Sequence, residues 1–440
     1  MSQYSQGPIL WNRAKQIIPG GNQLLSKRSE MFLPDFWPAY YSKAKGCEVW
    51  DLEGRHYFDF AQMGVGSCIL GYADEDVNRA VVDTIQKGSM CSLNCPEEVE
   101  LAETLVSLHP WADMVRFART GGEACAIAIR IARAATGRDK VAFCGYHGWH
   151  DWYLSSNLGD QSNLDGQLLP GLNPKGVTRT LKSTALPFGY NNLEGLERII
   201  HENPGEVGVI IMEPVRDHDP ERGFLEGVRK IADRIGAVLI FDEVTSGFRV
   251  NLGGIHLTYD VTPDMVVFGK ALGNGFPISA VVGKRDVMDA AQESFISSTF
   301  WTERVGFVAA LATLVKMRAQ HVQEKVVEYG TAINQGWTEA AHAADLKIKI
   351  SGIKPLTHIN FSHPEALALQ TFYTQEMLKK GFLAGAAVYS TLAYTPEVIE
   401  KFTAATYQVF SQIRDWLNRG ESIAHHLDGP IKHAGFKRLT

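Results

Sequence analysis

The fold is decided by two short stretches of sequence, VLIFDEV (residues 238–244) and MVVFGK (residues 265–270). In each, a run of apolar residues ends directly at charged side chains, Asp242 and Glu243 in the first and Lys270 in the second. Strands that lack an alternating polar face are buried on both sides, as in a parallel sheet covered by helices. Similar apolar runs alternate with helical patterns at 114–118, 140–144, 207–212 and 278–283. The sequence therefore predicts an α/β domain with a mostly parallel central sheet.

The two ends of the chain have a different pattern. Residues 47–60 alternate around Glu53-Gly54 and predict a β-hairpin. Helical spacing is found at 8–18, 97–108, 122–136, 222–235, over most of 305–343, and at 397–418. We expect a large domain over residues 61–320. A smaller α+β domain is expected from the two chain ends, residues 1–60 and 321–440.

The composition of the chain is that of a globular protein and argues against nucleic-acid or membrane binding. The chain has 440 residues, a net charge of −6, 45% hydrophobic residues and 21% charged residues, which is typical of a globular protein. A mildly acidic chain without a long basic run is a poor partner for nucleic acid or an anionic membrane surface. No apolar run approaches the roughly 20 residues of a membrane span, and the N-terminus lacks a signal-peptide pattern. The six cysteines form no C-x-x-C pair, so we expect reduced thiols in a cytoplasmic protein.

Several common catalytic motifs are missing. The sequence contains no G-x-x-x-x-G-K-[ST], no dinucleotide fingerprint, no H-E-x-x-H and no G-x-S-x-G. His147 and His150 are three residues apart, but no carboxylate or thiolate follows at metal-ligand spacing. They are interpreted as loop histidines, and no metal site is expected.

The two charged strand ends are the strongest chemical signal. Ligands of open α/β sheets bind where the carboxyl ends of the strands meet the loops. A carboxylate there, Asp242, needs a cationic or hydrogen-bonding partner; the alternative is that it caps the next element. Burial of Lys270 would lower its pKa and leave a nucleophilic amine, whereas the alternative is a lysine that reaches solvent.

Two further strand ends add to this signal. Thr120-Gly121-Gly122 joins a predicted strand to a predicted helix, and the free N–H groups of a helix N-terminus suit a phosphate. Tyr146 follows the strand at 140–144 and can stack on a planar ligand. Alone, each has an ordinary alternative, a glycine-rich turn or a core aromatic. Pyridoxal 5′-phosphate, with its phosphate, flat ring, basic nitrogen and aldehyde, needs all of these groups at once.

The motifs also carry a family resemblance. LIFDEVTSGFRV (239–250) and DMVVFGKALGNG (264–275) resemble the signature of the class III aminotransferases of fold-type I. The stretches 114–141 and GYHGWHD (145–151) resemble the subgroup that contains glutamate-1-semialdehyde 2,1-aminomutase. The resemblance implies the fold-type I architecture, a homodimer with shared active sites, and pyridoxal 5′-phosphate as cofactor with pyridoxamine 5′-phosphate as its intermediate form.

The resemblance also implies roles for individual residues. Lys270 matches the Schiff-base lysine that shuttles a proton, and Asp242 matches the aspartate paired with the pyridinium nitrogen. Glu213 matches a glutamate on the substrate side. The other implied cofactor contacts are Val244 and Tyr146 on the two ring faces, Thr120, Gly121 and Gly122 at the phosphate, and Thr299 at the phosphate of the neighbouring subunit.

Departures from the subgroup cluster on the expected substrate side. The stretch from Asn22 to Arg28 differs from the Asn-Ser-Pro-Val-Arg of the aminomutase, which leaves open whether Lys27 or Arg28 binds an anion. Residues 301–304 replace Gly-Asn-Pro, and Thr245 replaces a bulkier residue. We therefore expect an aminotransferase that moves an amino group from an amino-acid donor such as glutamate to an aldehyde or ketone, for example a sugar or a secondary metabolite. The alternatives are the aminomutase, a racemase or decarboxylase, and a non-catalytic cofactor-binding homologue.

Overall fold

A computed structural model describes residues 5–215 and 217–439 of the chain. These residues form two compact units. Unit one holds the chain up to Asp74 and from Glu324 onward, and unit two holds the intervening residues 75–323. The two units are described separately below.

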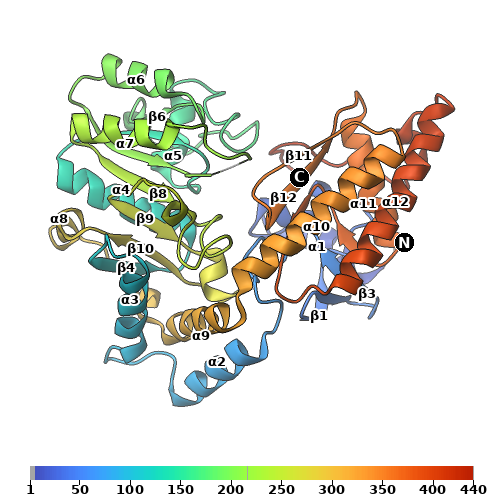
Figure 1. Cartoon of the computed structure of the whole chain (residues 1–440), viewed down its shortest axis with the longest axis horizontal. Coiled ribbons are helices and arrows are strands. Elements are labelled where there is room, and N and C mark those ends of the chain that lie inside the picture. Colours follow the sequence, from blue (N-terminus) through green and yellow to red (C-terminus); the bar gives the residue numbers. More distant parts are fainter. Residues whose placement is uncertain (1–4, 216, 440) are drawn as a thin grey trace. The chain divides into compact units, whose positions relative to one another are not determined.

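Unit two is built on a seven-stranded sheet with the order β4-β10-β9-β8-β7-β5-β6 (Figure 1). Its strands are β4 (Met114–Ala118), β5 (Lys140–Cys144), β6 (Ala185–Pro187), β7 (Val207–Met212), β8 (Val238–Asp242), β9 (Met265–Phe268) and β10 (Ser279–Gly283). β5, β6, β7, β8 and β9 pair in parallel, whereas β10 runs antiparallel to both β9 and β4. The predicted α/β fold with a mostly parallel central sheet is confirmed.

Helices cover the sheet, as the apolar strands require. Every residue of β7, β8, β9 and β10 is buried, and α4 packs across β10, β9 and β7. A capping box between Thr120 and Glu123 starts α4, and Gly137 in the left-handed conformation ends it. The helices of this unit are α2 (Glu75–Lys87), α3 (Pro96–Leu108), α4 (Gly121–Thr136), α5 (Asp151–Leu154), α6 (Leu193–Glu202), α7 (Phe224–Ile235), α8 (Arg285–Met288) and α9 (Arg304–Gln320).

The sheet topology brings the predicted site residues to one edge. Strands β4, β5, β7, β8 and β9 all point the same way, so their carboxyl ends lie along the same edge of the sheet. Thr120 and Tyr146 lie just beyond the ends of β4 and β5. Glu213 directly follows β7, Asp242 is the last residue of β8, and Lys270 lies just beyond β9.

Unit one contains two smaller sheets. One has the order β1-β2-β3-β13 and the other β11-β12-β14. The parallel pairing of β13 with β3, in which Phe382 lies opposite Phe58, joins the two ends of the chain. The strands are β1 (Tyr41–Lys45), β2 (Glu48–Asp51), β3 (His56–Phe60), β11 (Ile348–Ser351), β12 (Leu356–Phe361), β13 (Phe382–Ala384) and β14 (Ala387–Tyr389). The helices are α1 (Gln6–Ile17), α10 (Val322–Ala343), α11 (Ala366–Lys379) and α12 (Pro396–Asn418).

The long helical stretch predicted over residues 305–343 is two helices, α9 and α10. They are separated at His321, whose φ of 51° lies in the left-handed region and ends α9. Within the described part of the chain, no helix is long and apolar enough to cross a membrane.

Candidate active site

Lys270 is the first residue of a short 3-10 helix, η6 (Lys270–Gly273), and its own φ is 42°. Its Nζ donates a hydrogen bond of 2.7 Å to Thr245 Oγ1. Burial and then the positive charge of Arg249 lower the pKa of Lys270 to about 8, although the nearby carboxylates of Glu213 and Asp242 act in the opposite direction. An amine with this pKa is about one-tenth neutral at pH 7, far more than an ordinary lysine, and the neutral form is the nucleophile and the base.

Asp242 is 4% exposed and is surrounded by hydrogen-bond donors. Its Oδ1 accepts from the Val244 N–H at 3.0 Å. Its Oδ2 lies 2.8 Å from His147 Nδ1 and accepts from Cys125 Sγ at 3.3 Å. A carboxylate offers about four acceptor positions, so three donors leave room for one more. The N–H of a protonated ring nitrogen is a donor that fits this remaining position.

His147 is the ring that lies against the buried carboxylate of Asp242. Its Nε2 lies 3.2 Å from the carbonyl oxygen of Cys144, which can only accept a hydrogen bond. Its Nδ1 faces the carboxylate of Asp242, which is also an acceptor when ionised. The 1% exposed ring of His147 is thus held between the Cys144 carbonyl oxygen and the buried carboxylate of Asp242.

His147 and Asp242 also belong to a cluster of possible metal ligands that the spacing in the sequence did not predict. Atoms of Cys125, His147 and Asp242 that can bind metal lie within 4.8 Å of one another. The sequence predicted loop histidines with no carboxylate or thiolate at ligand spacing, but the fold brings both beside His147. Because Cys125 and His147 are each hydrogen-bonded to Asp242, these contacts explain the cluster without an ion.

Glu213 orients the loop that carries Tyr146. Its Oε2 accepts a hydrogen bond of 3.0 Å from the Tyr146 N–H. The Tyr146 ring is 38% exposed and meets the ring of Tyr153 edge-on, with centroids 5.9 Å apart. Tyr153 in turn donates to the carbonyl of Gly145, whose φ of 118° allows the sharp turn after β5. The loop is fixed from both sides, and the Tyr146 ring keeps an open surface.

The turn before α4 begins the helix with two glycines after a capping box. Thr120 Oγ1 donates to the Glu123 carboxylate at 3.1 Å and accepts from the Glu123 N–H at 3.4 Å. Its hydroxyl is therefore occupied by the capping box, and the N–H groups of Gly121 and Gly122 are the first two of the helix, which have no intrahelical acceptor. A Cβ added at Gly121 would lie 2.7 Å from Val244 Cγ1, so Val244 packs directly against this turn.

A second close contact joins this turn to the Tyr146 loop. A Cβ added at Gly148 would lie 2.7 Å from the Cα of Gly122. A Cβ added at Gly122 would lie 3.3 Å from His150 Nδ1. The absence of side chains at both glycines therefore lets residues 145–150 pack against the turn.

The segment that follows Thr299 is bound by Arg119, the residue directly before Thr120. The Arg119 guanidinium donates to the carbonyl oxygens of residues 300, 301 and 303 at 2.8, 3.0 and 2.5 Å. The side chain of Thr299 itself is exposed at the start of η8 (Thr299–Thr302). The contacts found in the described residues do not join it to Gly121 or Gly122 of the same chain.

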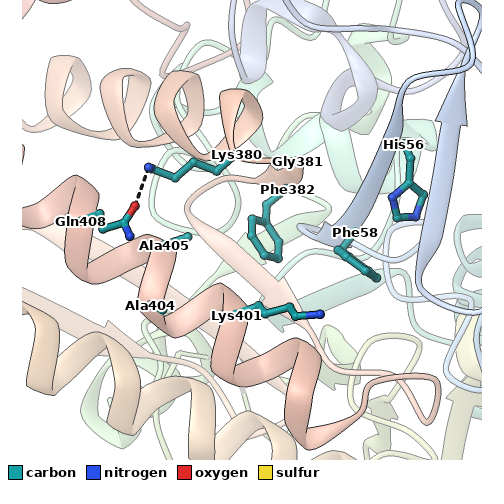
Figure 2. Close-up of a pocket in the computed structure, with 9 residues that line it drawn as sticks. All are labelled: His56, Phe58, Lys380, Gly381, Phe382, Lys401, Ala404, Ala405 and Gln408. Atoms are coloured by element: carbon teal, nitrogen blue, oxygen red, sulfur yellow. Dashed lines mark hydrogen bonds between the residues drawn. The ribbon is translucent and has the colours of Figure 1, made fainter.

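The remaining candidates lie in unit one. Lys27 and Arg28 belong to this unit, and Arg28 donates to the carbonyl of Lys437 at 3.1 Å. A pocket of about 400 Å³ lies in the same unit, and none of the predicted site residues lines it. Figure 2 shows the residues that do. Lys380 at this pocket is hydrogen-bonded to Gln408 at 2.7 Å, and Lys401 is paired with Glu397. Both of these lysine amines are thus engaged by neighbouring side chains.

Sequence reasoning missed His147, Cys125, Arg119 and Arg249 as parts of the site. His147 follows Tyr146 in the quoted motif, so its position next to a strand end was a signal. Cys125 lies on the first turns of α4 after the glycines, where a side chain can face the end of β8. Nothing in the spacing indicated Arg119 or Arg249, because their contacts are to backbone carbonyls that the sequence does not position.

Comparisons with known proteins agree with this arrangement. The family model "Aminotransferase class-III" matches residues 34–407. A 3-aminobutyryl-CoA aminotransferase from Cloacimonas acidaminovorans is 32% identical over 415 residues, which are 90% of this chain and 96% of that protein. A glutamate-1-semialdehyde 2,1-aminomutase from Methanothrix thermoacetophila is 34% identical over 426 residues, 91% of this chain and 95% of that protein.

A solved structure is similar over nearly the whole chain. An omega-transaminase from Sphaerobacter thermophilus superposes with a TM-score of 0.82 at 26% identity, covering 94% of this chain and 98% of that one. The sheet-edge arrangement, the family model and the relatives lead to the same conclusion: the chain belongs to the class III aminotransferases and is an aminotransferase of this family.

Proposed function

We propose that the protein uses pyridoxal 5′-phosphate to move an amino group from an amino-acid donor, with glutamate the first candidate, to an aldehyde or ketone. The observation that carries the proposal is the pairing at one sheet edge of a lysine whose pKa is about 8 with a buried, three-donor carboxylate. A module that only binds a ligand has no need for either group. When bound, the cofactor supplies the electron sink that such chemistry requires.

The residues present fit this cofactor. Asp242 has one acceptor position left for the ring nitrogen, and its charge keeps that nitrogen protonated. Val244 lies against the phosphate turn and offers an aliphatic surface to one ring face, while the half-open ring of Tyr146 offers an aromatic surface to the other. The free N–H groups of Gly121 and Gly122 suit the phosphate.

Lys270 moves the proton. With a pKa of about 8, its amine is both nucleophilic enough to engage an aldehyde and basic enough to remove a proton from the substrate carbon. Glu213 holds the Tyr146 loop by its backbone and acts as a positioning residue on the substrate side. Arg249 contributes a positive charge that favours the neutral amine.

We further propose a cytoplasmic homodimer with shared sites. Phe295 and Phe300 are 86% and 68% exposed on either side of Thr299. Large apolar side chains exposed together are typical of a surface that a partner covers. In this arrangement Thr299 reaches the cofactor phosphate of the second subunit.

The nature of the donor and the acceptor follows from an assay of the purified holoenzyme. Glutamate should convert the bound cofactor to its pyridoxamine form and release one equivalent of 2-oxoglutarate. A panel of donors, including a 3-amino acid and its thioester as the name 3-aminobutyryl-CoA suggests, then defines the substrate class. If no donor yields its keto product, the transaminase proposal is wrong.

A second candidate is glutamate-1-semialdehyde 2,1-aminomutase activity, which is favoured by the 34% identity to an enzyme of that name. Loss of the visible absorption of the cofactor with glutamate-1-semialdehyde alone, and with no donor of the panel, would support it. Release of carbon dioxide or racemisation of an amino acid without a keto product would instead identify a decarboxylase or a racemase.

A further inference from the structure

The amine of Lys270 has a hydrogen-bond partner that the proposed function does not use. Its Nζ donates to Thr245 Oγ1 at 2.7 Å, within the range of a well-formed hydrogen bond. Thr245 is three residues beyond the end of β8, on the loop that follows Asp242. It is also one of the positions at which this chain departs from the aminomutase subgroup.

Thr245 is itself held firmly. Arg249 is 1% exposed, and its Nε donates to the carbonyl oxygen of Thr245 at 2.6 Å. The N–H of Gly247 donates to the carbonyl of Glu243 at 2.8 Å and closes the turn around Thr245. These contacts fix the backbone that carries the hydroxyl.

The start of this loop is anchored by a fully buried carboxylate. The carboxylate of Glu243 accepts from the N–H groups of Ile255 and His256 at 2.6 and 2.9 Å. It also pairs with His256 Nδ1 at 2.6 Å, while His256 Nε2 accepts from the Trp111 indole at 3.1 Å. The loop between residues 243 and 256 is therefore closed at both ends, which fixes the backbone on which Thr245 lies.

The lysine is constrained from its own side as well. Its φ of 42° is uncommon for a residue with a Cβ, and such conformations persist only where the surroundings determine them. The hydroxyl and the amine thus approach each other from two separately fixed segments, so their contact is determined by the fold around them.

We propose that Thr245 is a positioning residue for the Lys270 amine: its hydroxyl accepts one N–H whenever the amine is not covalently engaged. An amine held by an N–H keeps its lone pair free, and the lone pair is what attacks the aldehyde and takes up the proton. Among the described residues, the charged and titratable groups that face this amine are Arg249 on the same loop, Glu213 after β7, Asp242 on β8 and Cys125 on α4. Thr245 is not one of these groups: it is uncharged and contacts the amine through a direct hydrogen bond. The inference rests on the proposed function.

The test compares Thr245→Val, which keeps the shape and removes the hydroxyl, with Thr245→Ser, which keeps the hydroxyl. Lys270 is labelled competitively with acetic anhydride from pH 6 to 11 in the cofactor-free protein, and the labelled peptide is quantified by mass spectrometry. Because the hydroxyl accepts a charge-assisted hydrogen bond from the ammonium form, its loss should lower the labelling midpoint by about one pH unit, a tenfold change in the proton affinity. Thr245→Ser should restore the midpoint to within a few tenths of a pH unit.

A second measurement uses the protein loaded with pyridoxal 5′-phosphate and the best donor. Exchange of the donor α-proton with deuterated solvent should slow by about tenfold or more in Thr245→Val, while KM for the donor stays the same. The reason is that the substitution changes the position of the Lys270 amine and leaves the donor-binding contacts intact. Thr245→Ser should recover most of the rate. Circular dichroism and thermal unfolding confirm that both variants are folded.

The outcomes separate the two proposals. An unchanged labelling midpoint in Thr245→Val, or a Thr245→Ser variant as defective as Thr245→Val, overturns the positioning role whatever the substrate is. A midpoint that shifts and is rescued by serine, in a protein that releases no keto product from any donor, supports the positioning role and contradicts the transaminase function instead.

Discussion

The contact between Gly148 and Gly122 predicts that the Tyr146 loop and the phosphate turn act as one cradle. In a Gly148→Ala variant, the new Cβ would lie 2.7 Å from the Cα of Gly122, a backbone atom that cannot swing away. The φ of Gly148 is 101°, so the alanine would also be strained by its own backbone. Both effects push the loop away from the turn.

The two contributions can be separated with a matched control. Gly137 also has a positive φ, 64°, but a Cβ there would meet nothing within 4 Å. It ends α4, whose 16 residues place it roughly 24 Å from the turn at the other end. Gly137→Ala should therefore carry only the backbone strain, about 1–2 kcal/mol. Gly148→Ala should carry at least that strain, because its φ of 101° lies beyond the left-handed α region, and in addition an overpacking cost of about 1–3 kcal/mol.

The assay measures stability and cofactor binding together. Urea unfolding of the cofactor-free variants should rank Gly148→Ala below Gly137→Ala in free energy of unfolding. Titration with pyridoxal 5′-phosphate, followed by tryptophan fluorescence, should give a Kd raised about tenfold or more in Gly148→Ala and unchanged in Gly137→Ala, since about 1.4 kcal/mol corresponds to tenfold. Equal Kd values in the two variants would refute the cradle, because the contact with Gly122 would then have no part in holding the cofactor.

Four other predictions address single side chains. Lys270→Ala should abolish turnover while the protein still binds the cofactor phosphate, and borohydride should leave no cofactor attached to the chain; an adduct on another lysine would contradict the assignment. Asp242→Asn should slow the chemical step in single-turnover experiments with little change in donor binding, and an unchanged rate would mean that this residue is not the ring-nitrogen partner. Thr299→Ala should weaken cofactor retention by about 1–3 kcal/mol, and mixing it with Lys270→Ala should restore activity above both parents if sites are shared, whereas heterodimers without recovery would place Thr299 at its own site. Burial lowers the pKa of His109 to about 4, so between pH 6.5 and 4 only the unfolded chain takes up this proton and stability falls as the pH falls. His109→Gln should remove about 2 kcal/mol of the loss between pH 7 and pH 5 in urea unfolding, and an unaltered pH profile would show that His109 is not the group responsible.

The fold was predictable because its signal is local and strong. The apolar runs at 140–144 and 207–212 coincide with β5 and β7, and the helix expected at 97–108 is α3. The direction of each strand, by contrast, could not be predicted from its apolar pattern. The run at 278–283 was predicted as a strand, but whether a buried strand pairs in parallel or antiparallel depends on its connections, and β10 runs antiparallel to both of its neighbours. β6 was not predicted, because a strand of three residues that ends at Pro187 has too short a pattern to detect.

The candidate site was predictable to the extent that its residues follow strands. Asp242 and Lys270 stand directly at the ends of apolar runs, so topology alone places them at one edge of the sheet. Thr120 illustrates the limit of that reasoning. The sequence indicates a hydroxyl beside a phosphate turn, whereas the structure shows this hydroxyl in a capping box with Glu123, which leaves backbone N–H groups as the main donors of the turn.

The surroundings of Asp242 show why the rest could not be predicted. A sequence can place His147 near a strand end, but the atoms that its ring nitrogens face follow from the fold. One nitrogen lies 3.2 Å from the Cys144 carbonyl oxygen and the other 2.8 Å from the Asp242 carboxylate. The same carboxylate accepts from the Cys125 thiol, on α4, and from the Val244 N–H, on the loop after β8. These three partners come from three separate segments of the chain, and they leave one acceptor position of the carboxylate for a further donor such as a ring N–H.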